Sequence, residues 1–164
     1  MAGMSTPLAY FITMHAHGTW LHGQDKGSVD RTHNLPGTEF LPPDEHLHHM
    51  ESEAMHSPPM LLETHHRHLI DKVFRQVIAH RKWTLHALHV RTTHVHVVVT
   101  APFPVEKVMG DLKAWATRRL REAGIVPRAA EVWARHGSTR YLWSDAQLAD
   151  KIDYVMNGQG PALA

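Results

Sequence analysis

The segment Arg91-Thr92-Thr93-His94-Val95-His96-Val97-Val98-Val99-Thr100 is the clearest guide to the fold of this chain. Its β-branched residues predict a strand, and side chains on a strand alternate between its two faces. Val95, Val97 and Val99 therefore share one face, which predicts a buried core on that side. His94 and His96 share the other face. Two imidazoles two residues apart on one face can hold one divalent metal ion, so the same strand predicts a site.

Further strands and helices are predicted on both sides of this segment. The runs Leu8–Met14 and Trp83–Val90 are rich in β-branched and aromatic residues and predict strands. The second of these runs connects to the His94/His96 strand through only a few residues, which predicts an antiparallel hairpin. Apolar residues at helical spacing predict helices over Leu62–Arg81 and Pro104–Ala123, the latter followed by Gly124.

The C-terminal third of the chain predicts strand and then helix. Glu131–Trp143 is interpreted as one or two short strands around a turn at Gly137. Ser144 to Gln147 fits a capping box, so the last helix is expected to begin at Ser144, and Gly158 is expected to end it. The resulting order predicts an α+β, ferredoxin-like fold, in which helices pack on one face of a mainly antiparallel sheet.

Length and composition limit the domain organisation. The 164 residues are enough for one domain, expected over 1–164, with a long loop excursion at about 17–60 that includes a short helix around 45–55. The chain has no Cys, which excludes disulfides and zinc-thiolate sites. No signal peptide and no apolar run long enough for a bilayer is present, so a cytoplasmic protein with no membrane partner is expected. Net charge is only +1, and the 17 His residues are the unusual number.

The metal interpretation of His94 and His96 competes with a simpler one, in which two strand histidines line a polar face. His-x-His occurs by chance in a chain this rich in His, and His15-Ala16-His17 is a rival pair. We favour His94 and His96 because they lie among valines in mid-strand, which makes a rigid ligand platform. The rival pair lies at a strand end, beside Gly18.

Tyr154 is the second candidate residue. Leu148, Ile152 and Val155 form the apolar stripe of the last helix, and Tyr154 falls outside that stripe among polar neighbours. The common interpretation is an amphipathic Tyr that lies across a groove. The functional interpretation is a nucleophile, which needs help at neutral pH because the reference pKa of a phenol is about 10. A metal that polarises the target, or Lys151, would supply that help.

Basic and aromatic residues raise the prospect of nucleic-acid binding. The helix over 104–123 has a basic face, which is either a solvated face or part of a surface that tracks a phosphate backbone. Trp133, Tyr141 and Trp143 are candidates for stacking on unpaired bases, although some of them must belong to the core. The candidate phosphate-binding residues are Lys107, Lys113, Arg118, Arg119, Arg121, Arg135, His136 and Arg140.

Together these features resemble the single-tyrosine HUH transposases of bacterial insertion sequences, with the REP-associated tyrosine transposases as the nearest group. The resemblance lies in His94-Val95-His96 on a strand, a long helix after it and a late helix that carries Tyr154. Other segments of the sequence are also similar to this family. They are Tyr10-Phe11-Ile12-Thr13 together with Gly18-Thr19-Trp20-Leu21-His22-Gly23, then Asp111-Leu112-Lys113-Ala114-Trp115-Ala116-Thr117-Arg118-Arg119-Leu120, and finally Arg135-His136-Gly137-Ser138-Thr139-Arg140-Tyr141-Leu142-Trp143.

The resemblance implies a function. His94 and His96 would bind Mg²⁺ or Mn²⁺, and Tyr154 would attack a phosphate of single-stranded DNA with hairpin ends, leaving a 5′-phosphotyrosine and a 3′-hydroxyl. The family supplies a third ligand, Asn or Gln, four residues after the Tyr, where this chain has Gly158. Gln159 is preferred as the ligand over Asn157, because a left-handed turn at Gly158 would swing it back. A homodimer is left open.

Two other functions compete with a DNA-cleaving and DNA-joining enzyme. The first is a non-catalytic nucleic-acid-binding protein on the same scaffold, as a decayed or domesticated relative. The second is a His-rich metal-binding protein or metallohydrolase that uses residues of the excursion, namely Asp44, His46, His48 and His49. A covalent DNA adduct would separate the enzyme from both.

Overall fold

The computed structural model describes residues 5–18, 59–161 and 163. Within these described residues, four strands and three helices follow one another in the order expected from the sequence. The excursion at 17–60, its short helix and the cluster Asp44, His46, His48 and His49 lie almost entirely outside the described residues. The elements are β1 (Ala9–Ala16), α2 (Thr64–His80), β2 (Thr84–Val90), β3 (His94–Thr100), α3 (Val105–Glu122), β4 (Trp133–Leu142) and α4 (Asp145–Asn157).

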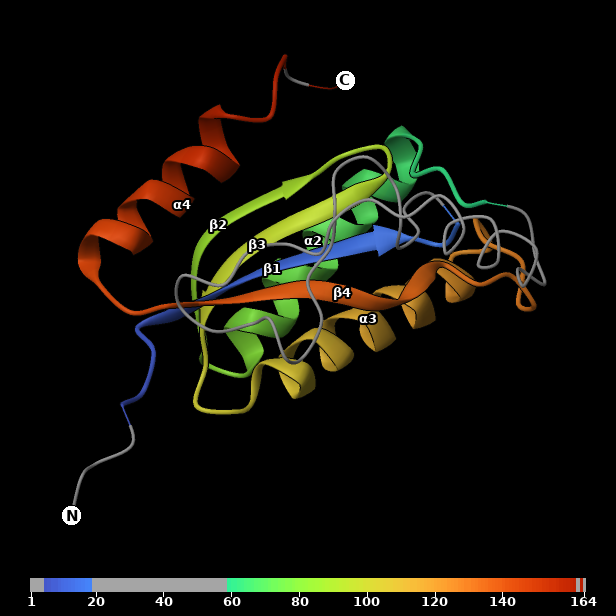
Figure 1. Cartoon of the computed structure of the whole chain (residues 1–164). Helices are drawn as coiled ribbons and strands as arrows, with labels where there is room; N and C mark the ends of the chain where they lie inside the picture. The colour runs from blue at the N-terminus through green and yellow to red at the C-terminus, as the bar shows by residue number, and fades with distance from the viewer. Residues whose placement is uncertain (1–4, 19–58, 162, 164) are drawn as a thin grey trace, which may run out of the picture.

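The four strands form one antiparallel sheet in the order β2-β3-β1-β4 (Figure 1). The β2–β3 hairpin predicted from the sequence is present, with Val90 opposite Val95. Strand β1 enters between β3 and β4, so that Met14 lies opposite both Val95 and Gly137. This order and the sequence of elements up to β4 are those of a ferredoxin-like arrangement, and the α+β class expected from the sequence is confirmed.

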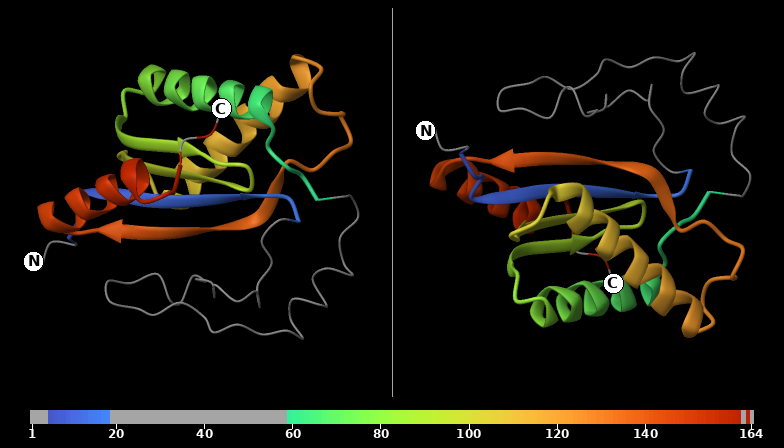
Figure 2. Two further views of the ribbon diagram at one scale, coloured as in Figure 1. Left: turned by 90° about the horizontal axis from the view of Figure 1, so that it is seen from above. Right: turned by 90° about the horizontal axis from the view of Figure 1, so that it is seen from below.

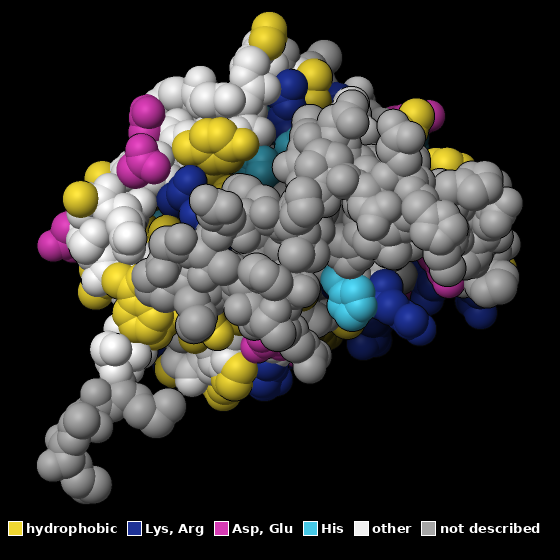
Figure 3. Space-filling view, viewed as in Figure 1, with side chains coloured by type: hydrophobic (Ala, Val, Ile, Leu, Met, Phe, Trp, Pro, Cys, Tyr) yellow, Lys and Arg dark blue, Asp and Glu magenta, His cyan; other side chains and the backbone are white. Residues whose placement is uncertain are grey.

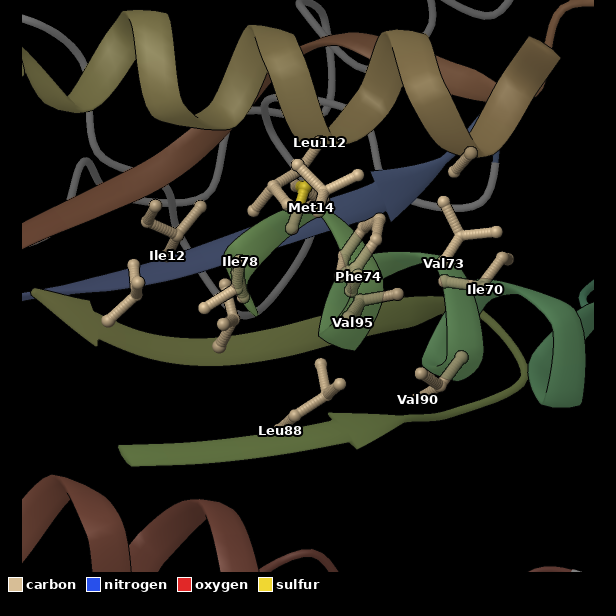
Figure 4. Close-up of a cluster of buried hydrophobic side chains, with 14 of the residues drawn as sticks. Ile12, Met14, Ile70, Val73, Phe74, Ile78, Leu88, Val90, Val95 and Leu112 are labelled. Carbon is tan, nitrogen blue, oxygen red and sulfur yellow. The ribbon is translucent and has the colours of Figure 1, made fainter. Parts of the chain in front are cut away.

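The main core lies between the sheet and helices α2 and α3, which pack on the same side of it (Figure 2). Val95, Val97 and Val99 of β3 are fully buried in this core, as their alternation predicts. Ile12 and Met14 of β1 join them from the neighbouring strand. Figure 4 shows Ile70, Phe74 and Ile78 of α2 and Leu112 of α3 packed with the strand residues Ile12, Met14 and Val95.

Helix α4 packs on the opposite face of the sheet from α2 and α3. It contacts β2, β3 and β4, and its buried residue Val155 belongs to a second, smaller cluster with Phe11 and Val98. Phe11 and Val98 alternate with the residues of the main core, so they project from the other side of their strands. The element order predicted helices on one face of the sheet, which holds for α2 and α3. The last helix instead covers the face that carries His94 and His96.

Strand β4 corrects the interpretation of Gly137 as a turn. The strand is continuous from Trp133 to Leu142, and Gly137 pairs with Met14 in its middle. A Cβ at this glycine would lie 2.5 Å from the Thr13 carbonyl oxygen and 2.8 Å from Met109 Sδ. Gly137 therefore allows β4 to pack closely against β1 and α3. A single glycine inside a strand can mark such a close approach of another backbone as well as a bend.

The predicted helix boundaries agree with the structure within about two residues. The Ser144 hydroxyl accepts a hydrogen bond from the Gln147 backbone N–H at 3.2 Å, as a capping residue should. The Gln147 side chain accepts from the Trp143 N–H at 2.7 Å, one residue before the cap. Gly124 follows α3 with a left-handed φ of 72°. No helix in the described part of the chain is long and apolar enough to cross a membrane.

Candidate active site

Four histidines from three adjacent strands gather on the sheet face that carries α4. The register places His15 of β1 opposite His94, and His89 of β2 opposite His96. The ring centroids of His94 and His96 are 4.6 Å apart, and those of His15 and His94 are 6.1 Å apart. In the view of Figure 1, histidine side chains are visible on this face (Figure 3). His94 and His96 therefore lie on one face of β3, as the sequence predicts.

The surroundings of His96 keep its imidazole neutral. Burial lowers the pKa of His96 to about 3, and the nearby imidazoles of His94, His15 and His89 lower it as well, against a smaller opposing effect of a hydrogen bond with Gln159. His96 Nδ1 lies 2.9 Å from the Thr13 hydroxyl. A neutral imidazole whose orientation is set by a neighbouring hydroxyl is the form that binds a metal ion.

Tyr154 lies beside His96 of the same chain. The centroids of the two rings are 5.6 Å apart, and the Tyr154 ring also meets Phe11 edge-on at 6.0 Å. The Tyr154 side chain is still 42% exposed, so a phosphate group of an outside molecule can approach it. Lys151 Nζ lies 5.3 Å from the centroid of the Tyr154 ring and 5.4 Å from that of Phe11.

The structure also separates the two amides that compete as the third ligand. The Gln159 side chain lies near His96, whose pKa it raises, and its Nε2 donates to the Tyr154 carbonyl at 3.2 Å. Asn157 turns the other way, and its Nδ2 donates to Asp153 Oδ1 at 2.8 Å. Of the two, Gln159 is the one that lies at the histidine cluster.

The expected left-handed turn at Gly158 is wrong. Gly158 has φ −96° and ψ 9°, and the left-handed glycine is Gly160, with φ 81°. Gln159 reaches back because the chain bends directly at the end of α4, where the Gly158 N–H donates to the Tyr154 carbonyl at 2.9 Å. A Cβ at Gly158 would lie 2.8 Å from that carbonyl oxygen and 3.2 Å from Tyr154 Cδ2. Glycine is therefore needed at this position for close approach to Tyr154.

These residues fit a divalent metal ion by their chemistry. His94 and His96 would supply imidazole nitrogens, and the Nδ1 atom of His94 lies 3.0 Å from the Thr93 hydroxyl. Gln159 would supply an amide oxygen. Three protein donors would leave the remaining coordination positions to water or substrate, as in a catalytic metal site.

The two histidines of the rival pair, His15 and His17, have different neighbours in the structure. His17 Nδ1 lies 3.1 Å from the Glu131 carboxylate, whereas His15 joins the cluster around His94. Sequence reasoning missed His15 and His89 as members of this cluster. Counting the alternation of β1 forward from Phe11, and of β2 back from the hairpin, would have placed both on the His94/His96 face once the strand order was known.

A second group with metal-ligand chemistry lies at the start of α2. The ligand atoms of Glu63, His65 and His66 lie within 4.8 Å of one another. However, His66 Nδ1 accepts a hydrogen bond from the Glu63 N–H, and its Nε2 donates to the Ile125 carbonyl, both at 3.0 Å. Both His66 nitrogens therefore serve the capping box of α2 and its contact with the segment after α3.

The candidate phosphate-binding residues divide between the two sides of the sheet. Five of them lie on α3, on the side away from Tyr154: Lys107, Lys113, Arg118, Arg119 and Arg121. Arg118 and Arg119 both pair with Glu122, and Lys107 pairs with Asp111. Lys113 is largely buried, which lowers its pKa to about 8, and it donates to the Ala134 carbonyl at 3.1 Å.

The other three candidates lie on β4. Arg140 pairs with Phe11 in the β1–β4 register and therefore shares the face that carries Tyr154. Arg135 and His136 are exposed farther back along the strand. Of the aromatic candidates, Trp133 packs against the main core and donates from Nε1 to the Lys113 carbonyl, so it acts as a core residue.

Comparison with known proteins gives a matching family and similar solved structures. The sequence model of the family described as "Transposase IS200 like" matches residues 59–155. The solved structure of a REP-associated tyrosine transposase bound to a REP hairpin superimposes with a TM-score of 0.52 at 11% identity, covering 94% of this chain and 68% of that one. A crystal structure of a candidate transposase from Deinococcus radiodurans R1 gives a TM-score of 0.49 at 16% identity, over 98% of both chains. No curated protein matches the chain.

Proposed function

This chain belongs to the IS200-like transposase family, and from that membership we propose that it cleaves and rejoins single-stranded DNA through a phosphotyrosine at Tyr154. One observation carries the proposal. Tyr154 lies beside His96 of its own chain, with 5.6 Å between ring centroids, and Gln159 lies near that same imidazole and raises its pKa. The candidate nucleophile and the candidate metal ligands belong to a single chain, which supports a reaction in cis.

Tyr154 would perform the covalent step. Its hydroxyl oxygen forms a bond to phosphorus while the bond from phosphorus to the 3′-oxygen breaks, which leaves a 5′-phosphotyrosine and a strand that ends in a 3′-hydroxyl. The phenolic proton leaves as the new bond forms, and a proton is taken up by the departing 3′-oxygen. Lys151, whose Nζ lies 5.3 Å from the centre of the Tyr154 ring, would stabilise the negative charge that develops on the phenol oxygen. The reverse step with another 3′-hydroxyl joins strands.

His94, His96 and Gln159 would hold the metal ion. A bound divalent ion would polarise the phosphoryl oxygen and so supply Lewis-acid chemistry at the scissile phosphate. Of the two ions expected from the sequence, Mn²⁺ suits this donor set better than Mg²⁺, because Mg²⁺ prefers oxygen ligands and imidazole suits transition metals. We therefore expect Mn²⁺ to support cleavage at lower concentration than Mg²⁺.

The DNA partner would contact both sides of the molecule. Arg140, which pairs with Phe11 on the Tyr154 face, would contact a strand that enters this face, whereas Arg118, Arg119 and Arg121 would contact phosphates on the α3 side. The similar REP-associated tyrosine transposase was solved bound to a REP hairpin, which supports a hairpin as part of the DNA partner. We propose single-stranded DNA with a hairpin as the partner.

The decisive test is a covalent adduct. Purified protein, Mn²⁺ and hairpin-bearing single-stranded DNA should give a protein–DNA adduct that survives denaturation, and Tyr154→Phe should abolish it while DNA affinity changes less than about twofold. Tyr141→Phe is the matched control, since Tyr141 lies opposite Tyr10 on the α3 side and should leave the adduct intact. DNA binding without any adduct in the wild-type chain would favour the non-catalytic binding protein. An adduct that persists in Tyr154→Phe would show that another residue is the nucleophile.

A further inference from the structure

Two side chains at the end of β2 tie the C-terminal end of α4 to the sheet. The His89 ring lies with Nδ1 3.1 Å from the Val155 carbonyl, a distance at which an Nδ1–H donates. The Arg91 guanidinium donates from Nη1 to the Pro161 carbonyl at 2.9 Å. Val155 belongs to the last turn of α4, where carbonyl groups lack partners within the helix, so a donor from outside is of most use there.

The two contacts enclose the residues of the candidate active site. Tyr154 directly precedes Val155, and Gln159 lies between Val155 and Pro161. His89 in turn sits opposite His96 in the β2–β3 register. The His89 imidazole therefore connects strands β2 and β3, next to the candidate metal ligand His96, with the turn of α4 that carries Tyr154.

The apolar contacts of α4 are few, so these polar contacts matter for its position. Val155 is its one fully buried side chain, while Leu148 and Ile152 are only partly buried against the same cluster. Tyr154 and Met156, at 42% and 54% exposure, cover little of the sheet. A helix held by so small an apolar face opens locally at low cost in free energy.

We propose that His89 and Arg91 are positioning residues that together form an α4 clamp, which holds Tyr154 and Gln159 against His94 and His96 of the same chain. The proposal rests on the proposed function for what the positioned groups do. The clamp acts through geometry alone: neither residue needs to touch DNA or metal. A displacement of about 1 Å at a reacting group lowers a rate by about a hundredfold, so a loose α4 would be poorly active.

The first test needs no DNA or metal and is therefore independent of the proposed function. In His89→Ala, we expect amide hydrogen exchange at residues 155–158 to become about tenfold faster, while amides of α3 keep their rates. His89→Asn places an amide N–H where Nδ1 stood and should restore protection. The matched control is His86→Ala on the same strand, whose ring lies 2.8 Å from the Thr100 hydroxyl. Unchanged exchange in His89→Ala, or equally faster exchange in α3, would overturn the clamp.

The second test measures adduct formation with Mn²⁺ at saturating DNA. His89→Ala should lower the maximal rate about 10- to 100-fold with an unchanged Kd for DNA, and His89→Asn should recover most of the loss. Arg91→Ala should mainly raise the Mn²⁺ concentration needed, since its contact lies beyond Gln159, and Arg91→Lys should lessen that effect. A wild-type chain that forms no adduct refutes the proposed function and leaves the exchange experiment to decide on the clamp. An active wild type with an equally active His89→Ala refutes the clamp alone.

Discussion

Gln159 and Asn157 lie two residues apart, yet their side chains have different partners. Gln159 donates to the Tyr154 carbonyl and lies near His96, whereas Asn157 donates to Asp153 on the outer side of α4. Gln159→Ala should therefore raise the Mn²⁺ concentration for half-maximal adduct formation by about 10- to 100-fold, and Asn157→Ala should change it less than about twofold. A Mn²⁺ titration of both variants checks this. A larger effect from Asn157→Ala would mean that the end of α4 rearranges when metal binds.

His96 makes the stability of the metal-free protein depend on pH. An unfolded His takes up a proton near pH 6.5, whereas folded His96 does so only near pH 3 because it is buried. Between these values the unfolded chain holds more protons, so the free energy of unfolding falls as pH is lowered from about 6.5 toward 3. The contribution of His96 is at most about 1.4 kcal/mol per pH unit.

Urea unfolding with chelator present, at pH 6.5, 5.5 and 4.5, measures this dependence. His96→Asn should lose less stability per pH unit than the wild type, by about 1 kcal/mol. Equal slopes for the two proteins would mean that His96 titrates normally in the folded state.

At the scale of elements, two glycines of neighbouring elements have opposite roles. A Cβ at Gly137 of β4 would meet the Thr13 carbonyl and Met109, whereas a Cβ at Gly110 of α3 would meet nothing within 4 Å. Gly137→Ala should cost about 1–3 kcal/mol, because the contact with backbone of β1 cannot be relieved by a side-chain rotation.

Gly110→Ala is the matched control and should be neutral or stabilise by up to about 1 kcal/mol, since alanine is the better helix former. Thermal and urea unfolding of both variants measure the difference. A neutral Gly137→Ala would show that β4 can move away from β1 and α3 at little cost, contrary to its continuous pairing with β1.

At the scale of the whole molecule, the sheet separates Tyr154 from the basic residues of α3. Arg118, Arg119 and Glu122 form exposed ion pairs, which are weak enough to be exchanged for contacts with phosphate. Replacing Arg118, Arg119 and Arg121 with Gln should flatten the log–log salt dependence of DNA affinity by about 0.7 for each lost phosphate contact.

The maximal rate of adduct formation should remain the same in this triple variant, because none of the three residues lies on the Tyr154 face. Arg140→Gln, on that face, is the comparison variant, and it should lower the rate as well as the affinity. An unchanged salt slope in the triple variant would return the α3 surface to an ordinary solvated helix face.

The local elements were predictable because their signals are local. Alternation in His94–Thr100 is enough to assign a strand with an apolar and a histidine face, and helical spacing is enough for α2 and α3. Gly137 was misread because a glycine at a turn and a glycine under close packing look the same in sequence. The prediction for Gly158 was wrong for a similar reason. A glycine at a helix end can be required by a positive φ or by a lack of space for a Cβ, and the sequence does not distinguish the two.

The sequence by itself determined that this chain builds an α+β sheet with two histidines on one strand face and a tyrosine on the last helix. Propensity and periodicity act over a few residues, so they can be read without the fold. Only the tertiary structure decided that β1 lies beside β3, which brings His15 to His94, and that α4 covers the histidine face, which brings Tyr154 and Gln159 to His96. Those contacts join residues about 60 to 80 positions apart, and strand order and helix packing depend on the free energy of the whole chain.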